Sequence, residues 1–429
     1  MRILYILLII VLSSLTTSCQ WLSPPRGPQD QYKTHLAQLN KETSKKQWQQ
    51  FFRERNAQAF WKTLQSGNTD LSFDFSNSDI PHKSHEEVAH GIIRYLAYNK
   101  NKFNISCLEV INGNFRSLDC AIGELSHLRI LSLSGNQLHS LPKSLGKLRD
   151  LQWLHLSNNR LSSLPKSLGR LSKLQFLVLD NNRLSSLPES LGRLSELKFL
   201  YLYKNLLISL PDTLGQLSNL YWLYLNHNQL QSIPDSLGKL SKLNQLELNH
   251  NQLKSVPDSL GKLNKLNRLY LNHNQLKSVP SSLGALGELQ RLDLSSNQLK
   301  SIPSSLGELG ELQRLNLSGN QLKSIPGSLG ELRELQRLDL SGNRLRSLPK
   351  SLGDLESLQQ LYLSRNQLSS LPKSLGNLNN LQWLYLSSNS LRSLPESFRK
   401  LAQQKVIQGL KPEEIKQLLG KAPGSSNRP

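Results

Sequence analysis

The dominant pattern along the chain is an alternation of leucine with polar residues that returns every 23 positions. The stretch "LQWLHLSNNRLSSLPKSLGRLSK", residues 151–173, is typical. Its "LxLxx" portion alternates apolar and polar positions with a period of two, which predicts a half-buried strand. We therefore expect Leu154 and Leu156 to point into a core, and Trp153 and His155 to point outward.

The unit is repeated thirteen times over residues 105–403. One such strand cannot bury its apolar face alone, so stacked copies are expected to form a parallel sheet in which each repeat contacts only its neighbours. The Leu-Pro step ends each strand, because proline fixes φ and lacks an N–H. The following "SLGKL" is expected to return the chain on the opposite side. The predicted fold class is an α/β solenoid with a parallel, concave sheet.

The full pattern, L-x-x-L-x-L-x-x-N-x-L-x-x-L-P-x-S-L-G-x-L-x-x, resembles the leucine-rich-repeat family, whose units run 20–29 residues. The resemblance covers residues 105–403. The "LPxSLGxL" half is most similar to the bacterial and Ras-group intracellular subtype. The resemblance implies a leucine-rich-repeat horseshoe.

One asparagine per repeat keeps the same phase, where the strand turns inward and backbone groups lose their ladder partners. A buried unpaired backbone group costs ~1–3 kcal/mol, and a stacked asparagine side chain can both donate and accept in that gap. We expect these residues to be scaffold rather than site. They are Asn136, Asn159, Asn182, Asn205, Asn228, Asn251, Asn274, Asn297, Asn320, Asn343, Asn366 and Asn389.

The two ends of the array need covers. Residues 31–104 carry apolar side chains at loose helical spacing and are predicted to form a small helical N-terminal cap. Within them "SHEEVAHGIIRYLAYN" begins with Ser84 and Glu87, which predicts a capping box. Residues 404–429 are predicted to hold a C-terminal cap helix over 411–420, followed by a loose tail.

The first residues predict an export signal. Residues 1–18 hold one arginine and an apolar run too short to span a bilayer, followed by small polar residues. The Ser-Cys at the end resembles a bacterial lipoprotein signal, which implies lipidation of Cys19 with palmitate, although Thr16 stands where that family prefers leucine. Residues 19–30 then form a Pro-rich tether. A lipid-anchored protein of the bacterial cell envelope is expected, with plain secretion or an uncleaved anchor as alternatives.

Composition narrows the chemistry only partly. The net charge of +21 and pI near 9.9 favour acidic partners without choosing among polymers, lipids and proteins. Three cysteines exclude a disulfide scaffold. Cys107 and Cys120 would be able to bond in an oxidising compartment, but we expect their directions to diverge, which leaves two ordinary thiols as the alternative.

No catalytic motif is found in the sequence: there is no Gly-rich phosphate loop, nucleophile elbow, HExxH or CxxC. We predict a protein that is not an enzyme and uses no cofactor. His227, His250 and His273 stand in three copies of "NHNQL", 23 residues apart. Imidazoles bind zinc, but a straight row on one rigid edge does not converge on a tetrahedral site. Solvated or partner-contacting histidines are favoured, with a metal row as the alternative.

The outward slots of the strands are rich in aromatic residues. Leucines already fill the inward positions, so these rings are expected on the surface, where exposed aromatics mark binding sites. Packing of the rings on one another along the sheet is the alternative. The predicted partner-binding residues are Trp153, His155, Phe176, Phe199, Tyr201, Tyr203, Trp222, Tyr224, Tyr270, Trp383 and Tyr385.

Two charged patterns complete the array. In repeats nine to eleven the outward slots carry Arg291 with Asp293, Arg314 with Asn316, and Arg337 with Asp339, which predicts a polar face whose charges satisfy one another. A basic stripe follows the ladder asparagines, partly offset by Glu308, Glu311, Glu331 and Glu334. The stripe consists of Lys254, Lys277, Lys300, Lys323 and Arg346.

The sequence therefore predicts a non-catalytic binding protein that takes a protein or peptide on its concave face. The mechanism is rigid display, because a preordered sheet loses little entropy on binding. Binding of an anionic polymer, glycan or lipid surface by the basic stripe is one alternative, and a structural or adhesion protein is another. No nucleic-acid partner is expected.

Overall fold

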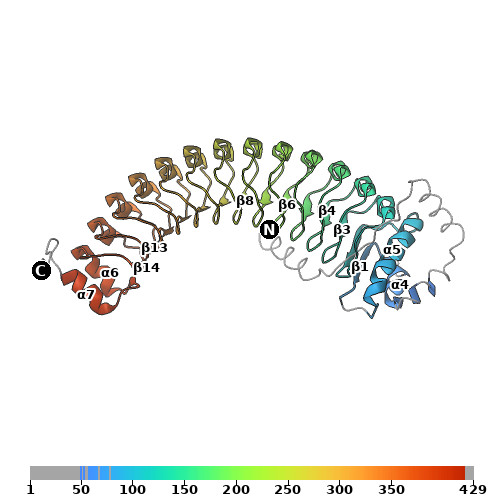
Figure 1. Ribbon diagram of the computed structural model, residues 1–429, viewed down its shortest axis with the longest axis horizontal. Helices are drawn as coiled ribbons and strands as arrows, with labels where there is room; N and C mark the ends of the chain where they lie inside the picture. Colours follow the sequence, from blue (N-terminus) through green and yellow to red (C-terminus); the bar gives the residue numbers. More distant parts are fainter. Residues whose placement is uncertain (1–48, 51, 54–56, 66–67, 77–78, 421–429) are drawn as a thin grey trace. The chain divides into compact units, whose positions relative to one another are not determined.

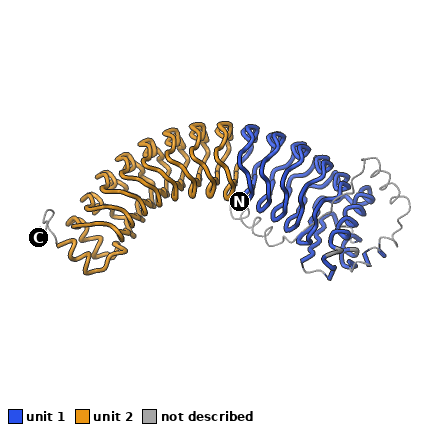
Figure 2. Tube along the Cα trace, in the orientation of Figure 1, with its two compact units in different colours: residues 1–220 blue, residues 221–429 orange. Residues whose placement is uncertain are grey.

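The computed structural model describes residues 49–420 except 51, 54–56, 66–67 and 77–78 (Figure 1). It divides into two compact units, residues 1–220 and 221–429, and each is described by itself (Figure 2). The predicted signal peptide, the tether and Cys19 lie outside the described residues. Within the described ranges, no helix is both long enough and apolar enough to cross a membrane.

The first unit contains six parallel strands that pair in chain order. The register advances by 23 residues at each step, so that Leu131 lies opposite Leu154 and Leu154 opposite Leu177. The strands are β1 (Asp70–Asp74), β2 (Cys107–Ile111), β3 (Ile130–Ser132), β4 (Trp153–His155), β5 (Phe176–Val178) and β6 (Phe199–Tyr201).

The second unit contains nine strands that pair in the same parallel, chain-order way. The predicted parallel-sheet solenoid is thus confirmed in each unit. The strands are β7 (Trp222–Tyr224), β8 (Gln245–Glu247), β9 (Arg268–Tyr270), β10 (Arg291–Asp293), β11 (Arg314–Asn316), β12 (Arg337–Asp339), β13 (Gln360–Tyr362), β14 (Trp383–Tyr385) and β15 (Ile407–Gln408).

Each strand from β2 to β14 is followed by a short 3-10 helix, as the "SLGKL" pattern predicts. From η2 onward a proline precedes each of these helices; Pro165, with φ −69° and ψ 141°, is typical. In each unit the strands line the inner side of the arc and the 3-10 helices the outer side (Figure 1). The helices are η1 (Cys120–Glu124), η2 (Lys143–Lys147), η3 (Lys166–Arg170), η4 (Glu189–Arg193), η5 (Asp212–Gln216), η6 (Asp235–Lys239), η7 (Asp258–Lys262), η8 (Ser281–Ala285), η9 (Ser304–Glu308), η10 (Gly327–Glu331), η11 (Lys350–Asp354), η12 (Lys373–Asn377) and η13 (Glu396–Phe398).

Adjacent 3-10 helices pack so closely that the glycine of each "SLG" is required. A Cβ atom built on Gly169 would lie 2.1 Å from the carbonyl oxygen of Ser190 in the next repeat. This distance is much shorter than a van der Waals contact, and the Ser190 carbonyl oxygen belongs to the backbone, so it cannot move away as a side chain could. The glycine therefore sets how closely the repeats stack on the outer side.

Leucines fill the interior between sheet and return segments. All leucines of the repeat at 151–173 are at most 7% exposed. Burying a leucine side chain contributes about 1.5–3 kcal/mol, so each repeat gains stability only when its neighbours cover it. The predicted inward direction of Leu154 and Leu156 is confirmed, since both are fully buried.

The asparagine ladder is confirmed by its hydrogen bonds. The Nδ2 of Asn251 donates to the carbonyl oxygens of Leu248 and of Leu225, each at 3.0 Å. Its Oδ1 accepts from the backbone N–H of Leu230 at 3.0 Å. One side chain thus satisfies backbone groups of its own repeat and of the preceding one, where the sheet ladder has ended.

The N-terminal cap differs from the all-helical prediction. It holds α4 (Gln58–Gln65) and α5 (His82–Tyr98), but β1 lies between them and adds a strand to the sheet. The physical reason is the alternation in "LSFDF", which buries Leu71, Phe73 and Phe75 on one side.

The helix α5 begins at His82 with Pro81 as its N-cap residue, and no side chain caps it. The capping box predicted at Ser84 is therefore wrong. The helix is held to the first repeat by the guanidinium of Arg94, whose Nε donates to the Asp119 carboxylate at 2.8 Å. Asp119 also caps η1 by accepting from the N–H of Ala121 at 2.9 Å.

The C-terminal end holds two further helices, α6 (Arg399–Gln403) and α7 (Pro412–Gly420), the second of which was predicted. The strand β15 was not predicted. It pairs with β14, placing Ile407 opposite Leu384, and so covers the last sheet edge of the array.

Candidate partner-binding surface

In the first unit the outward aromatic column is a continuous stack. The rings of Trp153 and Phe176 have centroids 4.3 Å apart at 17°, and those of Phe176 and Phe199 are 4.5 Å apart at 14°. Trp153 and Phe176 are half-buried, whereas Phe199 is 5% exposed. Packing along the sheet therefore accounts for much of this column, and Phe199 offers almost no accessible surface.

The neighbouring columns of this unit contain two desolvated ionisable groups. His155 Nε2 lies 2.7 Å from the hydroxyl of Ser157, and burial lowers the pKa of His155 to about 4. Asp180 accepts a hydrogen bond from the N–H of Tyr203 at 2.9 Å, and burial raises the pKa of Asp180 to about 7. At neutral pH His155 is uncharged, so this part of the face is apolar around a partly protonated carboxyl group.

Two predicted tyrosines complete this face of the first unit. Tyr201 is half-buried at the end of β6. Tyr203, also half-buried, accepts at its hydroxyl from Nδ2 of Asn181 at 3.1 Å, and the Lys204 ammonium lies 5.3 Å from its ring centroid. These contacts fix the Tyr203 ring while leaving part of it accessible.

The second unit carries aromatics at both ends of its sheet face. At β7, Trp222 and Tyr224 are half-buried and stack at 6.0 Å and 12°. Tyr221, 6.1 Å from Trp222, is 40% exposed and was missed by the sequence reasoning. The sequence did contain an indication that Tyr221 is exposed, because the equivalent position in each following repeat is an asparagine or a glutamine.

At the other end of this face, Trp383 is 43% exposed beside the fully buried Leu384. Tyr385 stacks on Tyr362 with centroids 4.6 Å apart at 5°. Between the two aromatic ends, Tyr270 is half-buried on β9. The predicted tryptophans and tyrosines of this unit therefore stand on the sheet face with accessible area.

The charged middle of this face satisfies itself only in part: Arg337 lies 3.6 Å from Asp339 as predicted, but Arg291 and Asp293 do not pair. The side chain of Asp293 bonds to Ser295 and Asn316 rather than to Arg291. In the described part of the chain, neither the Arg291 nor the Arg314 guanidinium has a hydrogen-bond or ion-pair partner. The expectation fails at Asp293 because Asn316 donates to its Oδ2 at 3.2 Å, so that both carboxylate oxygens already have neutral donors.

The histidines form the predicted row. The rings of His227 and His250 lie 4.2 Å apart at 9°, and those of His250 and His273 lie 4.2 Å apart at 12°. All three residues have φ of 53–54°, a left-handed slot that glycine fills at Gly319 and Gly342. Stacked parallel rings do not converge on one point, and no metal-holding group of three His, Cys, Asp or Glu side chains exists among the described residues.

Burial and neighbouring rings weaken proton binding at the middle of this row. Partial burial, and then the imidazoles of His227 and His273, lower the pKa of His250. Protonation of His250 is therefore disfavoured relative to a free imidazole.

The basic stripe is exposed along its whole length. None of its five cations forms an ion pair within the described ranges, and the same holds for Glu308, Glu311, Glu331 and Glu334. The expected partial neutralisation by these glutamates is thus not realised as direct pairing. The stripe remains a solvated row of positive charge.

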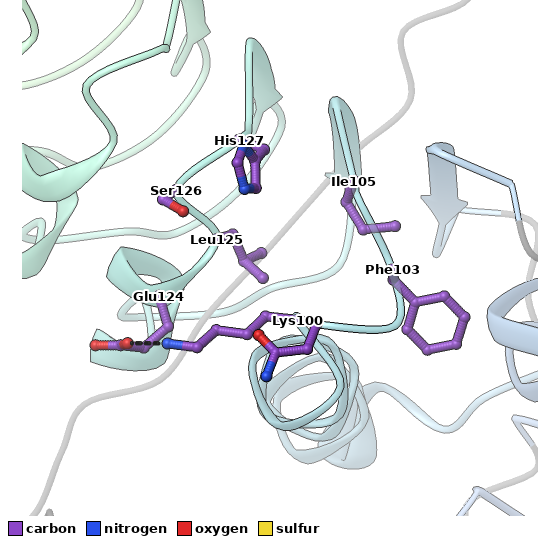
Figure 3. A pocket seen from close by; sticks show the side chains of 8 residues that line it. Lys100, Phe103, Ile105, Glu124, Leu125, Ser126 and His127 are labelled. Carbon is purple, nitrogen blue, oxygen red and sulfur yellow. Dashed lines mark hydrogen bonds and ion pairs between the residues drawn. The ribbon is translucent and has the colours of Figure 1, made fainter.

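Two other features offer no site. Cys107 and Cys120 are not bonded to each other. Burial raises the pKa of Cys107 to about 12, so Cys107 is not a reactive thiolate. A small cavity of about 120 Å³ lies between the end of α5 and the first repeat (Figure 3). The Lys100 ammonium there is already paired with Glu124 at 2.8 Å, so the cavity holds no free charge for a ligand.

Comparison with known proteins identifies the repeat. The family described as leucine-rich repeat region matches residues 112–205, 166–278 and 208–318, and the family described as leucine rich repeat matches residues 311–368, 333–391 and 356–405. The chain belongs to the leucine-rich-repeat family. A search of the curated proteins gives no match.

Solved leucine-rich-repeat structures resemble the chain over most of its length. A leucine-rich-repeat protein of Leptospira interrogans is 33% identical, with a TM-score of 0.62, covering 80% of this chain and 96% of that one. The Arabidopsis receptor kinase HAESA, solved with the peptide hormone IDA and the co-receptor SERK1, is 29% identical with a TM-score of 0.57, covering 72% and 58%.

A third similar structure is the ectodomain of the receptor kinase GASSHO1/SCHENGEN3 from Arabidopsis thaliana, solved with CASPARIAN STRIP INTEGRITY FACTOR 2. It is 34% identical with a TM-score of 0.56, covering 74% of this chain and 42% of that one. Family and fold together support a leucine-rich-repeat protein-binding module.

Proposed function

We propose that this leucine-rich-repeat protein binds a protein or an extended peptide on the sheet face of its repeats. The observation that carries the proposal is the placement of aromatic rings outside a complete leucine core. Trp383 is 43% exposed while Leu384, the next residue, is fully buried. Exposed tryptophan and tyrosine are the commonest anchors of protein interfaces.

The scaffold suits binding by rigid display. Every strand of a unit is hydrogen-bonded to its neighbours in a fixed register, and side chains such as Asn251 tie consecutive repeats together. A surface that is ordered before binding loses little conformational entropy on association. The complex of the similar receptor kinase HAESA with the peptide hormone IDA, and that of the GASSHO1/SCHENGEN3 ectodomain with CASPARIAN STRIP INTEGRITY FACTOR 2, are consistent with the same use of the fold.

The setting we propose is the bacterial cell envelope, with the protein held to a membrane by a lipid on Cys19. The support is the apolar run that stops before Cys19 and the Pro-rich residues that follow it. Labelling of the expressed protein with a palmitate analogue should be lost in Cys19→Ser. Equal labelling of the two proteins would rule the anchor out.

Site-specific crosslinking tests the proposed face. A photo-reactive phenylalanine analogue placed at Tyr270, on the sheet face, should crosslink the partner captured by the mature protein. The same analogue at Lys262, on the outer 3-10 helix η7, should not. Crosslinks from Lys262 alone would contradict the proposal.

A second candidate function is binding of an anionic polymer, glycan or lipid surface along the basic stripe. Its support is the unpaired, exposed state of the stripe's five cations, described above. Binding of a polyanion weakens steeply with salt, because condensed counterions are released on association. We would favour this function over protein binding if the affinity for the partner fell steeply between low and moderate salt and fell further in Lys300→Ala.

A further inference from the structure

Four arginines stand in one column on the sheet face of the second unit. The register places Arg268 opposite Arg291, Arg291 opposite Arg314, and Arg314 opposite Arg337, on strands β9 to β12. Neighbouring strands lie ~4.8 Å apart. Unit charges at such a distance repel by about 1 kcal/mol even in water. The column therefore destabilises the free protein unless something neutralises it.

The adjacent carboxylates are turned away from the middle of the column. The Oδ1 of Asp293 accepts from the N–H and hydroxyl of Ser295 at 2.9 and 2.6 Å, and its Oδ2 accepts from Asn316 at 3.2 Å. Asp339 makes the same contacts with Ser341, at 3.0 and 2.6 Å. Each carboxylate oxygen of Asp293 is thus already engaged by neutral donors.

The ends of the column have partners and its centre does not. Arg337 lies 3.6 Å from Asp339, donates to Gln360 at 3.3 Å and covers the ring of Tyr362 at 4.3 Å. Arg268 donates to Gln245 at 3.5 Å. Arg291 is half-buried and Arg314 exposed, and neither guanidinium has a partner in the part of the chain that is described.

We propose that Arg291 and Arg314 form the anion-binding centre of the sheet face and take up a side-chain carboxylate of an extended acidic peptide. Guanidinium groups are weakly hydrated forks that match a carboxylate with two parallel hydrogen bonds. The inference rests on the proposed function, since it names the chemistry of the partner at the same face.

The charge balance selects carboxylates over dense polyanions. The neighbouring column holds a carboxylate on alternate strands, those of Glu247 on β8, Asp293 on β10 and Asp339 on β12. A phosphate-rich polymer, which carries negative charge along its whole length, would meet repulsion from these three groups. A peptide that carries separate single charges meets the two free guanidiniums instead.

The spacing of the column also suits one backbone conformation. A polyproline II chain rises 3.1 Å per residue, so residues three apart are ~9.3 Å apart. Two strand spacings amount to ~9.6 Å. Acidic residues at i and i+3 of such a peptide, lying across the strands, would therefore meet alternate arginines. One carboxylate then lies at Arg291 or Arg314, and the other at an arginine at the end of the column. Trp222 and Tyr224 at one end and Trp383 and Tyr385 at the other supply apolar contacts beyond the charged centre.

The test uses a synthetic probe, a fluorescent, C-terminally amidated, proline-rich peptide with glutamates three residues apart, and its glutamine counterpart. Anisotropy titrations should show the glutamate peptide binding at least about tenfold tighter, as expected for charge-assisted hydrogen bonds. Arg291→Gln/Arg314→Gln should abolish this preference. Lys300→Gln/Lys323→Gln, which removes the same charge at the same 23-residue spacing, should retain it within about twofold.

Equal loss in the two double variants would show a general charge effect and overturn the assignment. So would a glutamine peptide with a free C-terminus that binds as tightly as the amidated glutamate peptide, because recognition would then lie at a chain end. Arg314→Lys keeps the charge but not the fork, and it should lose most of the preference. If the double arginine variant folds poorly, the glutamate preference of Arg314→Lys tests the assignment instead.

Failure of this inference can be told apart from failure of the proposed function. If the partner crosslinks from Tyr270 while the glutamate peptide shows no preference, the sheet face is the binding face and the arginine assignment is wrong. If Tyr270 gives no crosslink and the glutamate peptide shows no preference, both the proposed function and the arginine assignment are wrong.

Discussion

The hydroxyl of Ser295 donates to the carboxylate of Asp293 at 2.6 Å, and the N–H of the same serine donates to the same oxygen at 2.9 Å. This local clip holds the carboxylate on its own strand. Arg291, two residues before Asp293, is left without a partner among the described residues. Asp339 makes the same contacts with Ser341 and still lies 3.6 Å from Arg337, so the Asn316 amide at Oδ2 of Asp293 completes what leaves Arg291 available for a ligand.

Removing the clip should close the arginine site. In Ser295→Ala, one of the three hydrogen bonds to Asp293 is lost, and the carboxylate is freer to pair with Arg291. We expect the affinity for the acidic probe peptide to fall by a few fold, in line with the ~0.2–1 kcal/mol of an exposed ion pair. Ser364→Ala, at the same slot of a repeat without the aspartate, is the control and should leave the affinity unchanged.

The asparagine ladder predicts a large difference between adjacent residues. Asn251→Ala removes two donated hydrogen bonds and one accepted bond from buried backbone groups, and should lower the free energy of unfolding by at least ~1–3 kcal/mol. His250→Gly should be near neutral, because glycine relieves the left-handed φ of 54° while the ring stack is lost.

Thermal or denaturant unfolding of both variants measures this difference. A His250→Gly variant that is the less stable of the two would contradict the structural role of the asparagines. Tight stoichiometric zinc binding that is lost in His250→Gly would restore the metal interpretation of the histidine row.

The outer stacking predicts opposite outcomes for two glycines. A Cβ atom on Gly261 would lie 2.2 Å from the Ser282 carbonyl oxygen, so Gly261→Ala should destabilise the protein by ~1–3 kcal/mol through overpacking. Gly287 has nothing within 4 Å of such an atom, so Gly287→Ala should be neutral or stabilise by ~0.4–1 kcal/mol. Equal melting temperatures for the two variants would contradict the tight packing of the 3-10 helices.

Asp180 predicts a pH-dependent change in stability. Burial raises its folded pKa from 3.8 to about 7, so its contribution to stability is fully present below pH ~4 and is lost as the pH rises through ~7. Asp180→Asn should therefore be increasingly more stable than the wild type between pH 4 and pH 8, by on the order of 1–4 kcal/mol at the upper end. A difference that stays constant with pH would show that Asp180 is not desolvated.

The strands of the array could be predicted from the sequence because their leucines are buried in every repeat at one fixed period. Leu154 and Leu177 occupy the same environment, so one repeat explains the others. At the ends this redundancy is lost. The alternation of Leu71, Phe73 and Phe75 was present, but neighbouring helical patterns outweighed it, and β15 has only two residues.

The candidate site was harder to predict because surface side chains choose between competing partners. The sequence placed Arg291 and Asp293 two residues apart on one face, which favoured a pair. The Ser295 hydroxyl and the Asn316 amide engage both oxygens of Asp293 instead. The "D-L-S" spacing did not reveal this, because Asp339 and Ser341 share it and Asp339 still pairs with Arg337. The stacking that leaves Phe199 5% exposed likewise depends on ring orientations that no periodicity specifies.

The affinity of the captured partner for tryptophan variants of the second unit tests the central claim most directly. Truncating an interface anchor costs 2 kcal/mol or more, roughly thirtyfold in affinity. Trp383 and Trp222 lie outside the leucine core, so Trp383→Ala and Trp222→Ala should each keep the wild-type melting temperature. At least one of the two variants should bind the partner about thirtyfold more weakly. Lys300→Ala, on the basic stripe, should change binding by only ~0.5 kcal/mol. Unchanged affinity in both tryptophan variants, together with a large loss in Lys300→Ala, would contradict recognition on the sheet face.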